Sequence, residues 1–138
     1  MAEAYNFLHT IMSEFKEGWI IWGNHDIDAK SSDQVMTDSC LALFLPPNLK
    51  YMHQQQIELT GKKIGFNNWQ PEFNLEWVKG ELDMLFTHAR ICYKEDSDLY
   101  QSQYLDESKF KIAFCGDIHR PGQLGKYVSI GIPQRCKM

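Results

Sequence analysis

The chain has 138 residues and a mass of 16.1 kDa, which is room for one domain of ordinary size. Its residues are 43% hydrophobic and 23% charged, a balance that excludes intrinsic disorder as the overall state. The formal net charge is −4, so bulk positive potential cannot hold a polyanion. The charge is unevenly distributed, because residues 109–138 carry six basic residues against one acid, Asp117, which gives +5 there and −9 elsewhere. This C-terminal stretch could face phosphates.

The sequence shows neither a membrane-spanning stretch nor a targeting segment. No run of about 18 consecutive apolar residues occurs, and the N-terminus lacks the basic region, apolar core and cleavage site of a secretory signal. Four cysteines are scattered without a C-x-x-C pair, namely Cys40, Cys92, Cys115 and Cys136. We therefore expect a cytoplasmic protein with reduced thiols and no membrane partner.

The first half of the chain predicts helices and a buried strand. Residues 3–16 place apolar side chains at helical spacing and predict an amphipathic helix. Residues 19–22 are apolar at every position and predict a strand that is buried on both faces. Residues 31–45 begin with helix-capping residue types and predict a second helix, which two prolines end.

The second half predicts mainly short strands. Residues 57–59 and 63–66 flank a short polar turn and predict a hairpin. Residues 72–79 predict a short helix, and residues 93–108 are acidic and irregular, as in an insertion or a further helix. Three more strands are expected, over residues 84–86, 112–115 and 127–130. No repeat or linker divides the chain, so we expect a single α/β domain over residues 1–138.

Three of these strands run directly into a polar tip. The tips are Gly23-Asn24-His25-Asp26, Thr87-His88 and Gly116-Asp117-Ile118-His119. Each tip alone has a simpler structural explanation, because glycine, asparagine and aspartate are common in turns and a single histidine is seldom a ligand. Their joint occurrence at the carboxyl ends of strands, where the sites of layered α/β sheets form, favours a metal site.

These tips also match a set of family motifs. Gly23-Asn24-His25-Asp26 is similar to a G-N-H-[DE] block, His88 to an isolated metal-binding histidine, and residues 116–121 to a G-[HD]-x-H block followed by R/K-P. Over nearly its whole length the sequence resembles the calcineurin-like metallophosphoesterases. The continuation through Arg120-Pro121 and residues 125–131 is similar to the SbcD-like DNA-repair nuclease branch, which includes phage proteins.

The resemblance implies a role for each matching residue. Asn24, His88 and Asp117 would bind one metal ion of a pair, and His119 would bind the other. His25 would not bind metal, because the corresponding histidine of the family contacts the scissile phosphate and helps protonate the leaving oxygen.

The same resemblance implies two divalent metal ions and a DNA substrate. Two cations about 3.5–4 Å apart neutralise phosphate charge and lower the pKa of a bridging water. Mn²⁺ is the favoured ion because the ligands are nitrogen and oxygen, with Zn²⁺, Fe²⁺ and Mg²⁺ as alternatives. Arg120 and Lys126 are candidate contacts of the substrate phosphate.

Two motifs of the family pattern are absent from this sequence. D-x-H and G-D-x-x-D, which supply the aspartate that bridges both metals, would precede Gly23, but no aspartate occurs there. The second metal site is therefore incomplete. The implied fold is a partial calcineurin-like phosphoesterase fold, a layered α/β sandwich without its first strands, which leaves an apolar edge able to pair with another chain.

The sequence therefore predicts a hydrolase of DNA phosphodiester bonds, an endonuclease or exonuclease, that is the C-terminal portion of a catalytic domain. The missing motifs would come from a complementing N-terminal polypeptide, and enzymes of this branch work with an SbcC-like coiled-coil ATPase. A split gene or a truncation is favoured over a degenerate relative, because degeneration would be expected to erode Asn24, His25 and His88, and all three are intact. The alternatives are a non-catalytic metal- or partner-binding remnant of the fold and a small-molecule phosphodiesterase.

Overall fold

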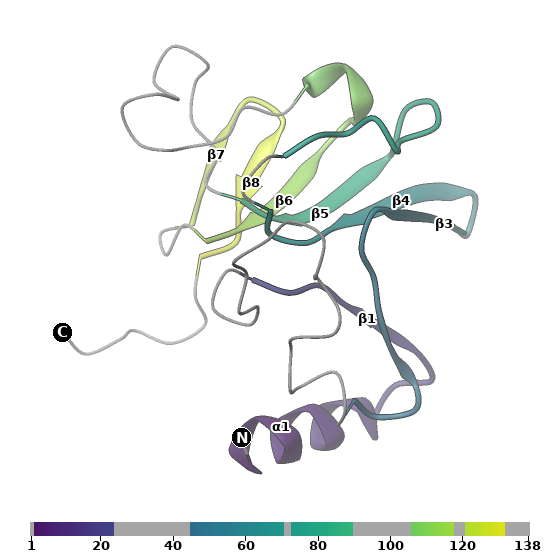
Figure 1. Cartoon of the computed structure of the whole chain (residues 1–138), viewed down its shortest axis with the longest axis vertical. Coiled ribbons are helices and arrows are strands. Elements are labelled where there is room, and N and C mark those ends of the chain that lie inside the picture. Colours follow the sequence, from purple (N-terminus) through teal and green to yellow (C-terminus); the bar gives the residue numbers. More distant parts are fainter. Residues whose placement is uncertain (1, 24–44, 71–72, 90–105, 118–120, 132–138) are drawn as a thin grey trace, which may run out of the picture.

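The computed structural model describes residues 2–23, 45–70, 73–89, 106–117 and 121–131 (Figure 1). These residues form an α/β structure in which strands predominate. The elements are α1 (Ala2–Met12), β1 (Gly18–Ile20), β2 (Leu49–Tyr51), β3 (Gln55–Leu59), β4 (Lys62–Asn67), β5 (Met84–His88), the 3-10 turn η3 (Glu107–Lys109), β6 (Ala113–Gly116), β7 (Gly122–Leu124) and β8 (Tyr127–Ser129).

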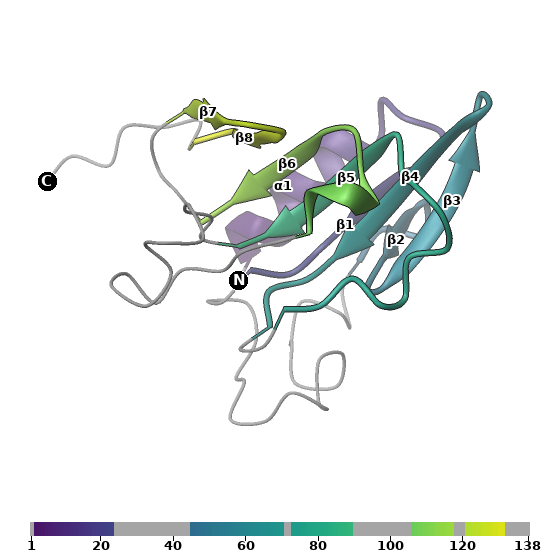
Figure 2. The same ribbon diagram turned by 90° about the horizontal axis from the view of Figure 1, so that it is seen from above.

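Six of the strands form one mixed sheet in the order β3-β4-β5-β6-β8-β7 (Figures 1 and 2). The central strands β4, β5, β6 and β8 are parallel, and β3 and β7 pair antiparallel at the two edges. The parallel strands therefore end at the same edge of the sheet, which we call the carboxyl edge. β1 and β2 form a separate parallel pair beside this sheet.

The hairpin predicted over residues 57–66 is confirmed. β3 and β4 pair in a register that places Leu59 opposite Lys62, with Thr60 and Gly61 as the turn. Both turn residues have positive φ angles, 50° and 74°. This is the backbone that a two-residue hairpin turn requires, and glycine adopts it without steric cost.

One face of the six-stranded sheet is packed under two crossing segments, and we call it the covered face. Residues 73–82 and 106–110 lie over this face and bury their apolar side chains against it. Leu82, Leu85, Phe110 and Ala113 are fully buried there. The free thiol of Cys115 belongs to the same core, and burial raises its pKa to about 12.

The opposite face, which we call the open face, is only partly covered. Phe66, Phe86 and Phe114 lie side by side on it, with ring centroids 5.7 Å and 5.2 Å apart. Trp19, from β1, packs on Phe66 at 6.2 Å. The rings of Phe86 and Phe114 themselves remain half exposed. The layer formed by β1 and β2 therefore covers one side of this face.

The predicted first helix and the three later strands are confirmed in outline. The predicted strand at residues 19–22 also forms, but the prediction that both of its faces are buried is wrong. The first helix forms over Ala2–Met12, and the strands predicted at residues 84–86, 112–115 and 127–130 are present with shifts of one or two residues. β1 forms where a strand was expected, but it pairs with β2 outside the main sheet and is half buried. A run of apolar residues does not distinguish a strand inside a sheet from one that lies across its face.

The short helix predicted over residues 72–79 is wrong for its described part, residues 73–79. Here the side-chain oxygen of Asn74 accepts a hydrogen bond from the Glu76 N–H at 3.3 Å, a local bond that competes with helix formation. The Lys79 N–H donates to Gln56 Oε1 at 3.0 Å, and Gly80 has a φ of 78°. A local hydrogen bond and a tertiary contact together therefore outweigh the helical spacing.

The remaining predictions meet the structure only in part. The helix expected over residues 31–45 and the insertion expected over residues 93–108 lie almost wholly outside the described residues. The edges of the described six-stranded sheet are β3 and β7, whose residues are largely polar, so the long apolar edge that the sequence predicts is not found in the described residues. Of the helices in the described ranges, none has the length and hydropathy that a bilayer crossing requires.

Candidate metal site at the carboxyl edge

The structure brings together two of the sequence-predicted metal ligands, His88 and Asp117. His88 is the last residue of β5, Asp117 directly follows β6, and the two strands are parallel neighbours in which His88 pairs with Gly116. Nε2 of His88 lies 3.7 Å from Oδ1 of Asp117. The two side chains are 24% and 14% exposed, so solvent and ions can reach them. The carboxyl edge therefore holds one nitrogen and one carboxylate donor side by side.

Two glycines, Gly23 and Gly116, leave room for the His88 imidazole because they have no side chain. A Cβ atom at Gly116 would lie 2.6 Å from Nδ1 of the ring, and one at Gly23 would lie 2.9 Å from Cε1. Both distances are shorter than van der Waals contact, so neither position accepts a side chain without movement. Gly23 opens the first predicted motif and Gly116 opens the third, so the described residues at the starts of both motifs meet at His88.

Asp117 has an unusual backbone. Its φ angle is 77°, in the left-handed region that residues with a Cβ rarely adopt. This conformation costs roughly 1–2 kcal/mol in a residue other than glycine. Such strain gathers at binding sites, where the surrounding structure holds a side chain in a required direction. Here the strained residue is the one whose carboxylate faces His88.

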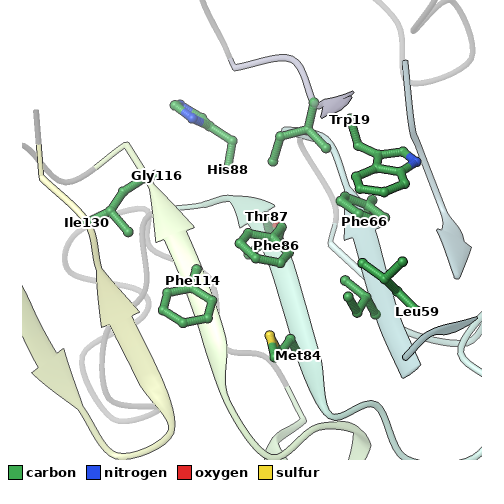
Figure 3. Close-up of a pocket in the computed structure, with 12 residues that line it drawn as sticks. Trp19, Leu59, Phe66, Met84, Phe86, Thr87, His88, Phe114, Gly116 and Ile130 are labelled. Atoms are coloured by element: carbon green, nitrogen blue, oxygen red, sulfur yellow. The ribbon is translucent and has the colours of Figure 1, made fainter. Parts of the chain in front are cut away.

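A pocket of about 530 Å³ lies over the open face and reaches this site (Figure 3). His88 and Gly116 line it at the carboxyl edge, and Met84 and Leu59 line it farther along the sheet. The lining residues that the structure describes are mostly apolar, and His88 is the one among them with an ionisable side chain. An anion at this site would be bound by groups at the edge.

A buried polar network lies next to the site, and sequence reasoning missed it. The side-chain oxygen of Asn68 accepts a hydrogen bond from the Trp22 N–H at 2.9 Å, and its Nδ2 donates to the Tyr51 hydroxyl. The Asn68 N–H donates to Nδ1 of His53 at 3.3 Å. A possible signal was that Asn67-Asn68, like the three tips, is a polar pair at the end of a strand.

Burial alters the acid–base behaviour of this network. It raises the pKa of Tyr51 to about 12, against the opposing effect of the hydrogen bond from Asn68. It lowers the pKa of His53 below the ordinary value of 6.5. Both groups are therefore favoured in their uncharged forms, in which Nδ1 of His53 can accept the hydrogen bond of Asn68.

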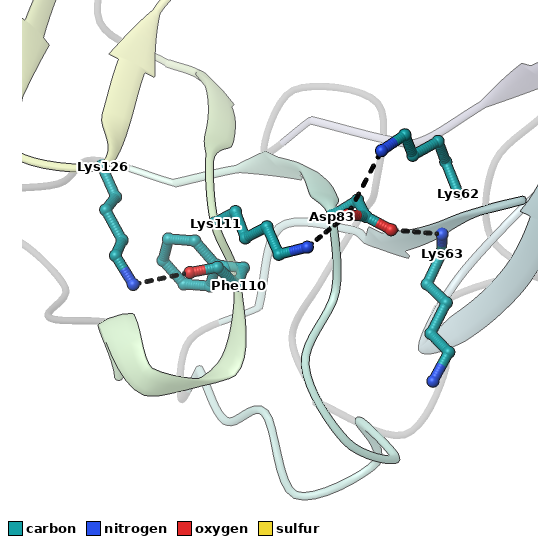
Figure 4. A network of polar contacts seen from close by, with 6 residues as sticks. All are labelled: Lys62, Lys63, Asp83, Phe110, Lys111 and Lys126. Carbon is teal, nitrogen blue, oxygen red and sulfur yellow. Dashed lines mark hydrogen bonds and ion pairs between the residues drawn. The ribbon is translucent and has the colours of Figure 1, made fainter.

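Lys126, a candidate phosphate contact, lies at the opposite edge of the sheet. It directly precedes β8, and its ammonium donates to the backbone oxygens of Glu107 at 2.6 Å and Phe110 at 2.9 Å. Figure 4 shows the bond to Phe110. In this conformation Lys126 binds the segment around η3 and does not face His88.

Asp83 anchors a second polar group near that edge (Figure 4). It accepts hydrogen bonds from the Lys111 ammonium at 2.7 Å and from the Lys63 N–H at 2.9 Å, and the Lys62 ammonium lies 3.9 Å away. The hydrogen bond from Lys111 is the main cause that lowers the pKa of Asp83. These contacts tie the residues that precede β5 and β6 to the start of β4, at the edge opposite the candidate site.

The donors at the carboxyl edge fit part of a metal site. Imidazole nitrogen and carboxylate oxygen are ligands that Mn²⁺, Fe²⁺ and Zn²⁺ all accept. Within the ranges that the structure describes, no group of three His, Cys, Asp or Glu side chains lies close enough to hold a metal ion. The other predicted site residues, Asn24, His25, His119 and Arg120, lie outside those ranges.

Comparisons with protein-family models, with curated proteins and with solved structures find no match to this chain.

Proposed function

We propose that this chain supplies part of a divalent-metal site that hydrolyses phosphodiester bonds in DNA. In this proposal it is the C-terminal portion of a calcineurin-like, SbcD-like nuclease domain, and the D-x-H and G-D-x-x-D motifs come from a complementing polypeptide. The observation that supports it best is the meeting of His88 and Asp117 at the carboxyl edge, 3.7 Å apart, with Gly23 against the imidazole.

Each residue has a distinct role in this proposal. His88 and Asp117 hold one cation together with Asn24, and His119 contributes to a second. His25 contacts the scissile phosphate and gives a proton to the leaving oxygen. A bound divalent cation supplies neutralisation of the phosphate charge and activation of water. Arg120 contacts the phosphate, whereas Lys126, which binds backbone oxygens at the other edge, is not part of the proposed site.

A non-catalytic metal- or partner-binding module is the second candidate. It is favoured by the small number of donors in the described residues, because two ligands suffice for weak binding and not for a dinuclear centre. The two candidates agree on metal binding at His88. They differ in whether any complemented form of the chain cleaves DNA.

Metal binding is tested first, by titrating Mn²⁺ into the purified chain in a calorimeter. We expect His88→Ala and Asp117→Asn each to weaken binding at least about tenfold, because each removes a ligand. His9→Ala is the matched control, since His9 lies on α1, apart from the six-stranded sheet (Figure 1). Absence of binding by the unmodified chain, or equal binding by His88→Ala, would contradict the proposal.

Catalysis is tested by adding a polypeptide that carries the two missing motifs, with Mn²⁺ and a labelled DNA duplex. We expect cleavage that His25→Ala abolishes, while Mn²⁺ binding by His25→Ala stays unchanged because His25 is not a ligand. The partner polypeptide incubated alone with DNA is the control. Metal binding without cleavage in any mixture would favour the non-catalytic module.

A further inference from the structure

Asn68 occupies a central place beside the candidate site. It directly follows β4, and its side chain is 0% exposed. Its side-chain oxygen accepts from the Trp22 N–H at 2.9 Å, and its side-chain nitrogen donates to the hydroxyl of Tyr51. One buried amide therefore joins the ends of β1, β2 and β4, three segments that are far apart in the sequence.

Trp22 is held on both sides of its main chain. Asn68 binds its N–H, and the Trp69 N–H donates to its carbonyl oxygen at 3.0 Å. The indole ring of Trp22 stacks on Tyr51 with centroids 5.3 Å apart, and it is almost completely buried. These contacts leave the backbone of Trp22 little freedom, so the position of the next residue, Gly23, is also determined.

Gly23 in turn lies against the metal-site histidine. Its Cα is close enough to the His88 ring that an added Cβ would come within 2.9 Å of Cε1 and 3.1 Å of Nδ1 and Nε2. A shift of Trp22 would move Gly23 and change the space in which the imidazole sits. The neighbouring Asn67 has no comparable role, because its side-chain nitrogen donates only to the Asn68 carbonyl, at 3.2 Å.

From this chain of contacts we infer that Asn68 is a positioning residue for the metal site at His88. It touches neither metal nor substrate, and it acts by fixing Trp22 and thereby Gly23 against the imidazole. The expected effect of Asn68 on metal affinity rests on the proposed function. The expected effect of Asn68 on the position of the His88 ring does not. Groups that orient metal ligands commonly change metal affinity 10–100-fold when they are removed.

The test compares Asn68→Ala with the matched control Asn67→Ala, which removes an adjacent and equally buried amide. We expect Asn68→Ala to weaken Mn²⁺ binding about 10–100-fold and Asn67→Ala to change it less than about threefold. Asn68→Asp keeps an acceptor for the Trp22 N–H, and the Tyr51 hydroxyl can turn to donate to it, so this variant should restore most of the affinity. Equal losses in Asn68→Ala and Asn67→Ala would overturn the inference.

Nuclear magnetic resonance of the metal-free protein provides a readout that does not depend on metal. Asn68→Ala should shift the imidazole nitrogen signals of His88, and Asn67→Ala should leave them in place. If the unmodified chain binds no Mn²⁺, the proposed function fails and these signals alone decide the inference. If Asn68→Ala does not fold, hydrogen exchange in the unmodified protein decides it, because the Trp22 amide must be protected and rapid exchange there would contradict the inference.

Discussion

The two faces of the six-stranded sheet differ in what covers them. On the covered face, residues 73–82 and 106–110 bring Leu82 and Phe110 into complete burial. On the open face, the β1–β2 layer reaches Phe66 but leaves Phe86 and Phe114 half exposed beside a pocket of about 530 Å³. The covered face therefore holds the larger and more fully buried core of the described structure, whereas the open face leads to the candidate site.

The largest expected effect is on the covered face. Phe110→Ala removes a fully buried ring that packs on Tyr127 with centroids 5.5 Å apart. Because the core around Phe110 is enclosed, the lost burial of the ring and the cavity left behind should together lower the free energy of unfolding by about 3–5 kcal/mol. Urea denaturation followed by circular dichroism measures this change. If Phe110→Ala lowers the free energy of unfolding less than the open-face variant Phe114→Ala does, the covered face is not the more stabilising of the two.

An intermediate effect is expected on the open face. Phe114→Ala removes a half-exposed ring that stacks on Phe86, so the free energy of unfolding should fall by only about 1–2 kcal/mol. The same variant should reduce binding of a hydrophobic fluorescent dye such as ANS, because the ring lines the pocket. Phe110→Ala, which does not line the pocket, should not reduce dye binding in its folded state. Unchanged dye binding by Phe114→Ala would show that the open face is not the accessible one.

The smallest expected effect is a dependence of stability on pH, caused by His53 in the β1–β2 layer over the open face. Burial holds the pKa of His53 below its ordinary value of 6.5, so the folded state carries fewer protons than the unfolded state. The stability that this group contributes is present above pH 6.5 and is lost as the pH falls below that value. Protonation at Nδ1 also opposes the hydrogen bond from the Asn68 N–H.

We therefore expect the free energy of unfolding to decrease as the pH is lowered below neutrality, and His53→Gln to reduce that decrease. Hydrogen exchange should show the loss of protection in β1 and β2 before β5 and β6, because His53 joins the β1–β2 layer to the end of β4. The control is His9→Gln, which leaves this junction intact. An undiminished pH dependence in His53→Gln would exclude His53 as the cause.

Local sequence patterns predicted the hairpin and the positions of the apolar strands. The hairpin at Thr60-Gly61 follows from turn chemistry, and the apolar strands β5 and β6 follow from runs of buried residue types. The placement of His88 beside Asp117 followed from one general property, that neighbouring parallel strands end at the same edge.

Features that depend on distant contacts could not be predicted in this way. Residues 73–79 have helical spacing, yet they form no helix, and the Lys79 N–H instead donates to Gln56, which lies 23 positions away in the chain. β1 has the composition of a central strand, yet it pairs with β2 outside the main sheet. The bond between Trp22 and Asn68 spans 46 positions in the chain, and no local pattern reveals it.

The absence of a side chain at Gly23 and Gly116 has a consequence for ion capture, because both glycines lie against the His88 ring. A histidine on an open surface loses rotamer entropy when it closes on an ion, at a cost on the order of 1 kcal/mol. Contact with the two glycine backbones restricts the rotamers open to the His88 ring in the folded chain, so part of this loss belongs to folding and not to capture. An arriving cation therefore meets a donor that the folded chain has already partly oriented.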